Sequence, residues 1–261
     1  MPTRSRPLPY MIPLLLACTA LLALTAYLFG GSPSARGRHL PVTEAVGEPA
    51  DGCSPLACVV IDPGHGGEDG GASSASGVVE KEINLSVALA LRDLFEAAGI
   101  PVVMTRTEDK LLYDRNVDFH GRKKVLDLAA RRLVAEKTAA AHGGSSLLIS
   151  IHMNAFPQSQ YSGMQVWYGT GSPTSQSVAE SIQTASVALM PHNHREIKAA
   201  GSSIYLLDRV KTPAVLVECG FLSNPAEAAR LSRESYRRAL AALIFSAAAP
   251  YLASADTAQG K

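Results

Sequence analysis

From Ala57 onward the chain alternates between short runs rich in β-branched residues and longer segments with apolar residues at helical spacing. Runs of the first kind predict strands, and segments of the second kind predict helices. The predicted strands cover 57–62, 101–106, 146–152, 164–168, a short run near 204–207, and 214–219. The predicted helices cover 82–98, 118–141, 175–190 and 235–252. Because such alternation is typical of α/β folds, we expect a single layered domain with a twisted, mostly parallel sheet of about six strands flanked by helices.

The first 30 residues differ in composition from the rest of the chain. Residues 1–8 carry two arginines, whereas residues 9–30 are almost entirely apolar and carry no charge. A helix of about 20 residues rises ~30 Å, which is enough to cross the core of a bilayer. The basic flank predicts a cytoplasmic N-terminus. We therefore expect a transmembrane anchor that places the remaining chain on the extracytoplasmic face, with a cleaved signal peptide or a lipoprotein signal at Cys18 as alternatives.

A linker and a folded domain are expected to follow this segment. Residues 31–55 are rich in Gly, Pro, Ser and Ala and show no periodicity, which is typical of a linker. We assign the folded domain to 56–252 and a frayed tail to 253–261. Cys53 and Cys58 lie five residues apart in a segment expected outside the cytoplasm, where a disulfide can form. Two free thiols are the alternative.

The composition limits the classes of function. The 261 residues are 47% hydrophobic, which is enough for one sizeable core. The formal net charge of only +1 gives no global attraction to nucleic acid. One predicted helix and its flank mix both signs of charge, at Asp118, Arg122, Lys123, Lys124, Asp127, Arg131, Arg132 and Glu136. We interpret this mixture as a solvated helix face rather than a binding surface for acidic ligands.

Four polar residues stand beside apolar runs at widely separated positions. They are His65 in DPGHGG, Glu80 in VVEKEINL, His152 in LISIHMNA and Glu218 in VLVECGF. Three of them follow short β-branched runs, and open α/β sheets assemble their sites at the carboxyl ends of their strands. Two imidazoles and a carboxylate suit a catalytic zinc, which leaves a fourth position to water. We therefore expect a Zn²⁺ site with one further carboxylate beside it.

Each of these residues also has an ordinary structural explanation. The glycines around His65 could hold a phosphate, although the segment lacks a Walker lysine and a GxGxxG motif. Glu80 and Glu82 could each simply favour a helix dipole, and their chemistry alone does not choose between them as ligands. His152 could be a hydrogen-bonded core histidine. Glu218 is more informative, because a carboxylate in an apolar run must meet a cation, a metal or hydrogen-bond donors, and burial raises its pKa toward the range useful for proton transfer.

The motifs DPGHGGEDGGA, EKEIN, SIHMNA and VECGFLSNPAEA together resemble those of the zinc-dependent N-acetylmuramoyl-L-alanine amidases of the amidase 3 type, which hydrolyse bacterial cell-wall peptidoglycan. The resemblance covers residues 57–252, and the order of the four motifs makes it specific. It implies that zinc is held by His65, Glu80 and His152. It also implies that Glu218 is the catalytic carboxylate.

The resemblance has further implications for the site and the substrate. It favours Glu80 over Glu82, because the ligand glutamate of the family precedes the position of Lys81. The bond cut would join the lactyl group of N-acetylmuramic acid to the L-alanine of the stem peptide. Asn154 is a candidate donor to this substrate, with a role in capping the strand end as the alternative.

Within the family, the short architecture and the N-terminal segment look most like the sporulation and germination amidases that initiate muramic-δ-lactam formation in spore cortex. The segment 121–146 is longer than in most relatives, which affects the expected groove but not the metal site. The expected partners are peptidoglycan as substrate and the membrane through residues 9–30, with an activating protein as an open question and no nucleic acid. A zinc carboxypeptidase acting on the same polymer and an inactive wall-binding relative are the alternatives.

Overall fold

The computed structural model describes residues 56–113 and 122–252. Within these two ranges no helix is both long enough and apolar enough to span a membrane. Several expectations concern residues outside the described ranges and stay predictions. They are the basic flank 1–8, the membrane segment 9–30, the linker 31–55 with Cys53, and the tail 253–261.

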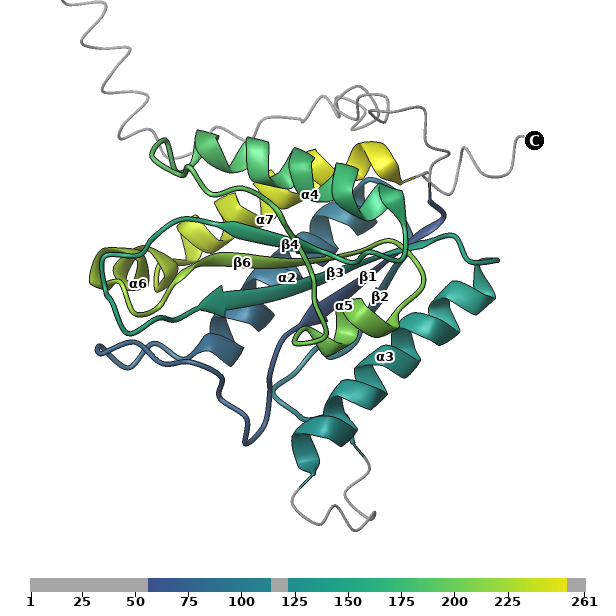
Figure 1. Cartoon of the computed structure of the whole chain (residues 1–261), viewed down its shortest axis with the longest axis horizontal. Helices are drawn as coiled ribbons and strands as arrows, with labels where there is room; N and C mark the ends of the chain where they lie inside the picture. Colours follow the sequence, from purple (N-terminus) through teal and green to yellow (C-terminus); the bar gives the residue numbers. More distant parts are fainter. Residues whose placement is uncertain (1–55, 114–121, 253–261) are drawn as a thin grey trace, which may run out of the picture. The chain divides into compact units, whose positions relative to one another are not determined.

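A six-stranded sheet lies at the centre of the domain (Figure 1). In spatial order its strands are β2 (Val102–Met104), β1 (Cys58–Pro63), β3 (Ser146–Asn154), β6 (Ala214–Phe221), β4 (Gln165–Tyr168) and β5 (Lys198–Ala199). All neighbouring strands pair in parallel except β4 and β6, which pair antiparallel. The expected mostly parallel α/β sheet is therefore confirmed.

Helices cover both faces of this sheet. One face is covered by α2 (Glu80–Ala97), α4 (Pro173–Ala185) and α7 (Glu234–Ala248), and the other by α3 (Lys123–Ala141) and α5 (Tyr205–Arg209) (Figure 1). The short helix α6 (Pro225–Leu231) follows β6. The single 3-10 turns η3 (Ser186–Ala188) and η4 (Ala249–Tyr251) extend α4 and α7. The layered arrangement follows from the expected alternation of elements.

The apolar pattern of each element explains its place. Every residue of β1 is buried, as is typical of a central parallel strand with both faces covered. In α2 the buried side chains recur at helical spacing, for example at Ile83, Val87 and Leu91. Along β6, Val217 faces the core under α2, α4 and α7, whereas Leu216 faces the smaller core under α3 and α5. The strand ends are thereby fixed relative to both layers.

The predicted strand at 204–207 is wrong. This segment begins the helix α5, and the sixth strand of the sheet is instead β5. Leu206 and Leu207 are both buried in the core under α3 and α5. A strand would point these adjacent side chains to opposite faces, whereas a helical turn lets both pack on the same core.

Helix α6 was missed by the periodicity, because it is only 7 residues long. Its start is nevertheless marked in the sequence. The Asn224 side chain caps the backbone N–H groups of Ala226 and Glu227, and Pro225 occupies the first turn. The other predicted helices are confirmed with small changes at their ends, and α3 begins at Lys123 within the described residues.

The two described cysteines, Cys58 and Cys219, are buried and form no disulfide with each other. The Cys58 Sγ lies 3.6 Å from the Val59 carbonyl oxygen, and burial raises the pKa of this thiol to about 11. The Cys53–Cys58 disulfide and its alternative, two free thiols, both stay untested, because Cys53 lies outside the described residues. Cys219 is fully buried, as expected of a small apolar side chain.

Candidate metal centre

The carboxyl end of β1 turns into the glycine-rich loop that carries His65. This residue has φ 60°, which is uncommon for a residue other than glycine. Two buried arginines hold the loop by its carbonyl oxygens. Arg106 donates to Pro63 and Gly64, each at 2.9 Å, and Arg131 donates to Pro63 at 2.7 Å and His65 at 2.6 Å. These bonds fix the backbone from which the imidazole projects.

Arg131 is itself fixed by two buried carboxylates. It lies 2.7 Å from Asp62 and 2.7 Å from Asp127. Asp62 also accepts hydrogen bonds from Thr105 and Ser150. Burial alone would raise the pKa of Asp62, but the charge of Arg131 and these hydrogen bonds outweigh burial and lower it.

The interpretation of this helix as a solvated face is therefore wrong for two of its residues. Arg131 and Asp127 are only 2% and 4% exposed. Their spacing of four residues predicts an ion pair in α3, but the same spacing occurs on solvated faces. The residues that support the loop, including Asp62 and Arg106, were consequently not among the candidates.

Three of the four candidate residues come together as an expected ligand set. The Glu80 Oε1 atom lies 3.2 Å from His65 Nε2 and 3.0 Å from His152 Nδ1. The ligand atoms of all three lie within 4.8 Å of one another. The two imidazole rings meet edge to face, with centroids 5.0 Å apart. Two imidazoles and one carboxylate are ligands that Zn²⁺ accepts, with a further position left for water.

Neighbouring groups orient this set. His65 Nδ1 lies 2.9 Å from an oxygen of Asp69, which is the type of carboxylate support that fixes a metal-binding imidazole. Glu80 accepts backbone hydrogen bonds from Ala72 at 2.8 Å and Met153 at 3.1 Å. Asp69 was not among the candidate residues, although its place four residues after His65 in the same turn was a usable signal.

Electrostatics favour positive charge among these side chains. Burial raises the pKa of Glu80, but the hydrogen bonds and charges of His152 and His65 outweigh it and hold the pKa far below its ordinary value. Burial lowers the pKa of His65, but Glu80 and Asp69 outweigh it and raise the pKa. A carboxylate that stays ionised between two imidazoles fits a bound cation.

Glycines let the parts of the set approach one another. A Cβ atom at Gly64 would lie 2.2 Å from the His152 ring. A Cβ atom at Gly71, which has φ +68°, would lie 2.5 Å from the Glu80 carboxylate and 2.8 Å from the His65 ring. Both positions therefore exclude a side chain.

Glu218 lies beside His152, because these residues are partners in the pairing of β3 with β6. Its Oε2 atom is buried and has no hydrogen-bond partner among the described residues. Burial is the largest influence on its acidity and raises the pKa of Glu218 to about 7. A carboxyl group of this kind can exchange a proton near neutral pH. The neighbouring Cys219 is turned into the core, and burial raises the pKa of its thiol far above the ordinary value, so it is not a nucleophile.

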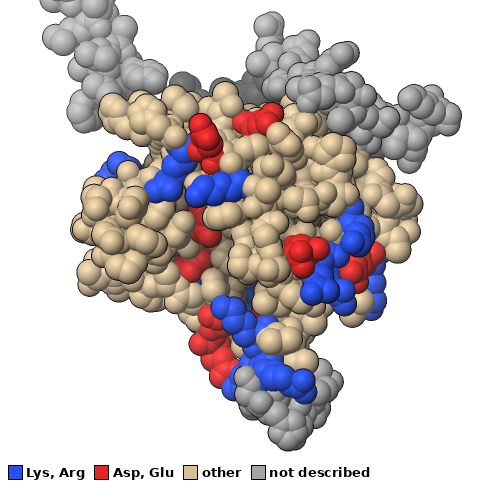
Figure 2. Space-filling model, viewed as in Figure 1, with Lys and Arg blue, Asp and Glu red and all other residues tan. Residues whose placement is uncertain are grey.

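A cavity of about 260 Å³ gives access to this group of residues. His65, His152 and Glu218 line it, together with Lys124 from the start of α3 and Tyr205 from α5. Figure 2 shows acidic side chains in a hollow of the viewed face, with Lys and Arg side chains near its rim. Asn154 lies at the end of β3, where an irregularity interrupts the pairing with β6. It is not among the residues that line the cavity.

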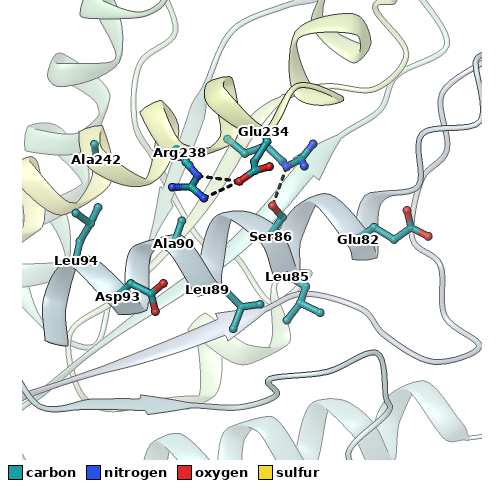
Figure 3. Close-up of a pocket in the computed structure, with 11 residues that line it drawn as sticks. Glu82, Leu85, Ser86, Leu89, Ala90, Asp93, Leu94, Glu234, Arg238 and Ala242 are labelled. Atoms are coloured by element: carbon teal, nitrogen blue, oxygen red, sulfur yellow. Dashed lines mark hydrogen bonds and ion pairs between the residues drawn. The ribbon is translucent and has the colours of Figure 1, made fainter. Parts of the chain in front are cut away.

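Glu82 lies at a second hollow and not at the candidate metal centre. A groove of about 850 Å³ runs between α2 and α7 and is lined by Leu85, Leu89 and Leu94 (Figure 3). Glu82 lies at one end of this groove and is exposed. Glu80, two residues earlier, is only 3% exposed and lies between the imidazoles. The structure therefore brings Glu80, and not Glu82, to the candidate metal centre.

Comparison with known proteins identifies the family. The model of the Amidase_3 family, described as N-acetylmuramoyl-L-alanine amidase, matches residues 59–249. The chain belongs to this family. The match spans almost all of the described domain of the amidase and confirms the resemblance found in its motifs.

Two similar proteins illustrate the relationship. The germination-specific N-acetylmuramoyl-L-alanine amidase of Bacillus subtilis is 33% identical over 231 residues, which cover 88% of this chain and 90% of that protein. The structure of the CwlD amidase from Clostridioides difficile in complex with the GerS lipoprotein has a TM-score of 0.67 at 35% identity. It covers 75% of this chain and 98% of that one.

A third comparison supports the same fold. The crystal structure of N-acetylmuramoyl-L-alanine amidase from Clostridium difficile 630 has a TM-score of 0.61 at 28% identity, and covers 74% of this chain and 95% of that chain. The amidase therefore shares its fold and its enzyme class with these cell-wall hydrolases.

Proposed function

We propose that this amidase uses zinc to hydrolyse the amide bond between the lactyl group of N-acetylmuramic acid and the L-alanine of the stem peptide. The observation that carries the proposal is the convergence of His65, Glu80 and His152 beside Glu218, whose buried Oε2 atom has no hydrogen-bond partner among the described residues. Three ligands from the protein and one adjacent carboxylate are what metal-assisted hydrolysis needs.

The three residues would hold zinc, which supplies a Lewis acid for the carbonyl and lowers the pKa of water. Glu218 accepts a proton from the attacking water as the new C–O bond forms. It then returns this proton to the nitrogen of L-alanine as the C–N bond breaks. The products are a lactyl carboxylic acid on the sugar and a stem peptide with a free amino terminus.

The direct test is analysis of the products released from peptidoglycan by the purified full chain. We expect intact stem peptides that begin with L-alanine, and no release in the presence of a chelator. Glu218→Gln should lower the rate by roughly 10²–10⁴-fold, the contribution typical of a general acid–base group. Glu82→Gln is the matched control and should keep the rate of the wild type. Release of single amino acids would indicate a carboxypeptidase, and no release from any peptidoglycan would indicate a wall-binding relative.

We further propose that the substrate is spore-cortex peptidoglycan. The similarity to the germination-specific amidase of Bacillus subtilis over 88% of the chain supports this assignment. The measurement is the muramic-δ-lactam content of cortex from spores in which only this amidase is present as wild type or as Glu218→Gln. Equal lactam content in the two would contradict the assignment.

The expected anchor and partner are part of the same proposal. The apolar segment 9–30 would hold the enzyme at the outer face of a membrane. Deletion of 9–30 should move the protein from the membrane fraction to the soluble fraction.

An envelope lipoprotein partner is supported by the complex of the similar CwlD amidase with GerS. Co-purification of one such lipoprotein with the full chain, and a higher hydrolysis rate in its presence, are the expected results.

A further inference from the structure

A group of aromatic side chains lies outside the metal centre. Phe156 and Tyr161 are 48% and 42% exposed, and their rings meet edge to face with centroids 5.1 Å apart. The Tyr161 ring stacks on the ring of the buried Phe221, with centroids 6.4 Å apart. The Arg195 guanidinium lies 4.5 Å from the centre of the Phe221 ring. We call Phe156, Tyr161, Phe221 and Arg195 the aromatic platform.

The platform continues the edge of the sheet that carries the candidate metal centre. Phe156 follows His152 by four residues after β3, and Phe221 follows Glu218 by three residues at the end of β6. The two segments are joined beyond the site, because Asn154 pairs with Phe221. At ~3.3 Å per strand residue, Phe221 lies about 10 Å along β6 from Glu218. The platform is therefore within the reach of a polymer whose reacting group is at Glu218.

A buried carboxylate holds the platform in place. Glu227 is 2% exposed and accepts hydrogen bonds from the backbone N–H groups of Phe221 at 2.7 Å and Gly163 at 3.1 Å. Gly163 has φ +93°, and a Cβ atom there would lie 2.5 Å from Asn193. Arg195 donates to the carbonyl of Ser162 at 2.8 Å. Hydrogen bonds thus hold the backbone at Phe221 and next to Tyr161, and such pre-ordering lowers the entropy lost on binding a ligand.

We propose that the aromatic platform is a binding subsite for a sugar ring of the glycan strand that neighbours the N-acetylmuramic acid whose amide bond is cut. Pyranose rings of a β-1,4-linked strand present flat faces of C–H groups, and the electron-rich face of an aromatic ring attracts such partially positive hydrogens. The inference rests on the proposed function, in which the amide bond that is cut is attached through a lactyl group to a sugar ring. That ring and its neighbours along the strand must therefore lie close to the metal centre.

The same observations favour sugar over the other possible ligands. A stem peptide carries carboxylates, whose natural partners are cations. The cation of the platform, Arg195, is only partly exposed and donates to the Ser162 carbonyl, whereas its two exposed members are uncharged rings. An exposed apolar patch can also mark a protein interface, but a protein seated about 10 Å along β6 from Glu218 would compete for this surface with the strand that carries the reacting group. The platform is therefore assigned to the strand.

The experiment is titration of the full chain, in detergent, with the soluble β-1,4-linked hexamer of N-acetylglucosamine, followed by calorimetry. This probe has no lactyl group and no amide to a peptide, so its binding does not depend on hydrolysis. We expect Phe156→Leu and Tyr161→Ala each to weaken binding at least about fivefold, because each removes an aromatic face. Tyr161→Phe keeps the ring and should bind within about twofold of the wild type.

Leu133→Ala is the matched control, because Leu133 is also 48% exposed but lies on α3. It should leave binding unchanged, and unchanged melting temperatures should show that all variants fold. A wild type that does not bind the hexamer, or equal affinities for wild type, Phe156→Leu and Tyr161→Ala, would overturn the proposal.

Kinetics separate the sugar from the other ligands. We expect Tyr161→Ala to raise KM for long glycan strands by a clearly larger factor than KM for a single N-acetylmuramoyl peptide, which lacks the neighbouring sugar rings. An equal loss on both substrates would assign the platform to the stem peptide, and no change on either would assign it to another partner; each result overturns the inference. Hexamer binding without amide hydrolysis would reject the proposed function alone, and hydrolysis without hexamer binding would reject the platform alone.

Discussion

The two faces of the sheet differ in the kinds of side chain that are buried on them. The face under α2, α4 and α7 is a continuous apolar core that includes Val87, Leu91 and Phe95. The face under α3 and α5 has a smaller apolar core and, next to it, the buried ion pairs of Arg131 with Asp62 and Asp127. The cavity that leads to the candidate metal centre lies on this second face.

The two faces are therefore stabilised by different kinds of interaction, and the candidate metal centre opens onto the second. Apolar burial stabilises the first face at roughly 25 cal/mol per Å². On the second face, charged side chains are buried, and each depends on a partner to offset its desolvation. Arg131 uses that environment to hold the carbonyl oxygens of Pro63 and His65. On the first face, a substitution should therefore destabilise the domain by creating a cavity. On the second face, it should do so by leaving a buried charge unpaired.

The largest effect is expected from Arg131→Ala. Removal of the guanidinium leaves Asp62 and Asp127 buried without their cation, which should cost about 3–5 kcal/mol of unfolding free energy. Chemical denaturation measures this change. Arg132→Ala, at the next position and partly exposed, should change stability by less than about 1 kcal/mol. Equal losses of unfolding free energy in the two variants would show that the buried ion pairs do not stabilise the second face.

A core truncation on the other face should cost slightly less. Leu91 lies on the buried face of α2 and is fully buried, and Leu91→Ala should lower the unfolding free energy by about 2–5 kcal/mol through lost burial and a cavity. Zinc bound per folded chain should stay at the wild-type value. A loss of zinc without unfolding would show that the two faces are not separable.

The third substitution, Glu218→Gln, should raise the unfolding free energy instead of lowering it. The pKa of Glu218 is raised by burial from 4.5 to about 7 in the folded chain, so the folded state keeps a proton that the unfolded state has lost between these values. Stability should therefore fall as the pH rises through this window. With chelator present, Glu218→Gln should be more stable than the wild type at pH 8, by up to ~3 kcal/mol. The difference should disappear near pH 4, and a pH-independent difference would contradict the burial of this carboxyl group.

The smallest effect is expected at the rim of the groove between α2 and α7. Glu82 is exposed there, away from the imidazoles, so Glu82→Gln should change stability by no more than about 0.5 kcal/mol. Zinc content and hydrolysis should equal those of the wild type. A loss of zinc in Glu82→Gln would show that the wrong glutamate has been assigned to the centre.

The sequence predicted the parts of the site that follow strands better than the parts that support them. His65, His152 and Glu218 stood out as candidates because apolar runs of strand length lead into each. The choice of Glu80 over Glu82 came from the family resemblance, because both glutamates lie in the first turn of α2 and residue chemistry alone does not tell which one faces the imidazoles.

The supporting network was missed for a physical reason. Asp127 and Arg131 have the spacing of a surface ion pair, and burial depends on which face of α3 meets the sheet. The run at 204–207 was mistaken for a strand, because a helix of 5 residues is too short for its period to be visible. Such features depend on tertiary packing, which local pattern does not encode.

The most direct test of the account is the zinc content of the folded full chain after remetallation and removal of loosely bound metal. We predict one zinc ion per chain in the wild type and in Glu218→Gln. Glu80→Gln and His152→Ala should lose most of this zinc while they remain folded by circular dichroism. A folded wild type without stoichiometric zinc, or full zinc retention in Glu80→Gln and His152→Ala, would contradict the assignment of His65, Glu80 and His152 as the metal ligands.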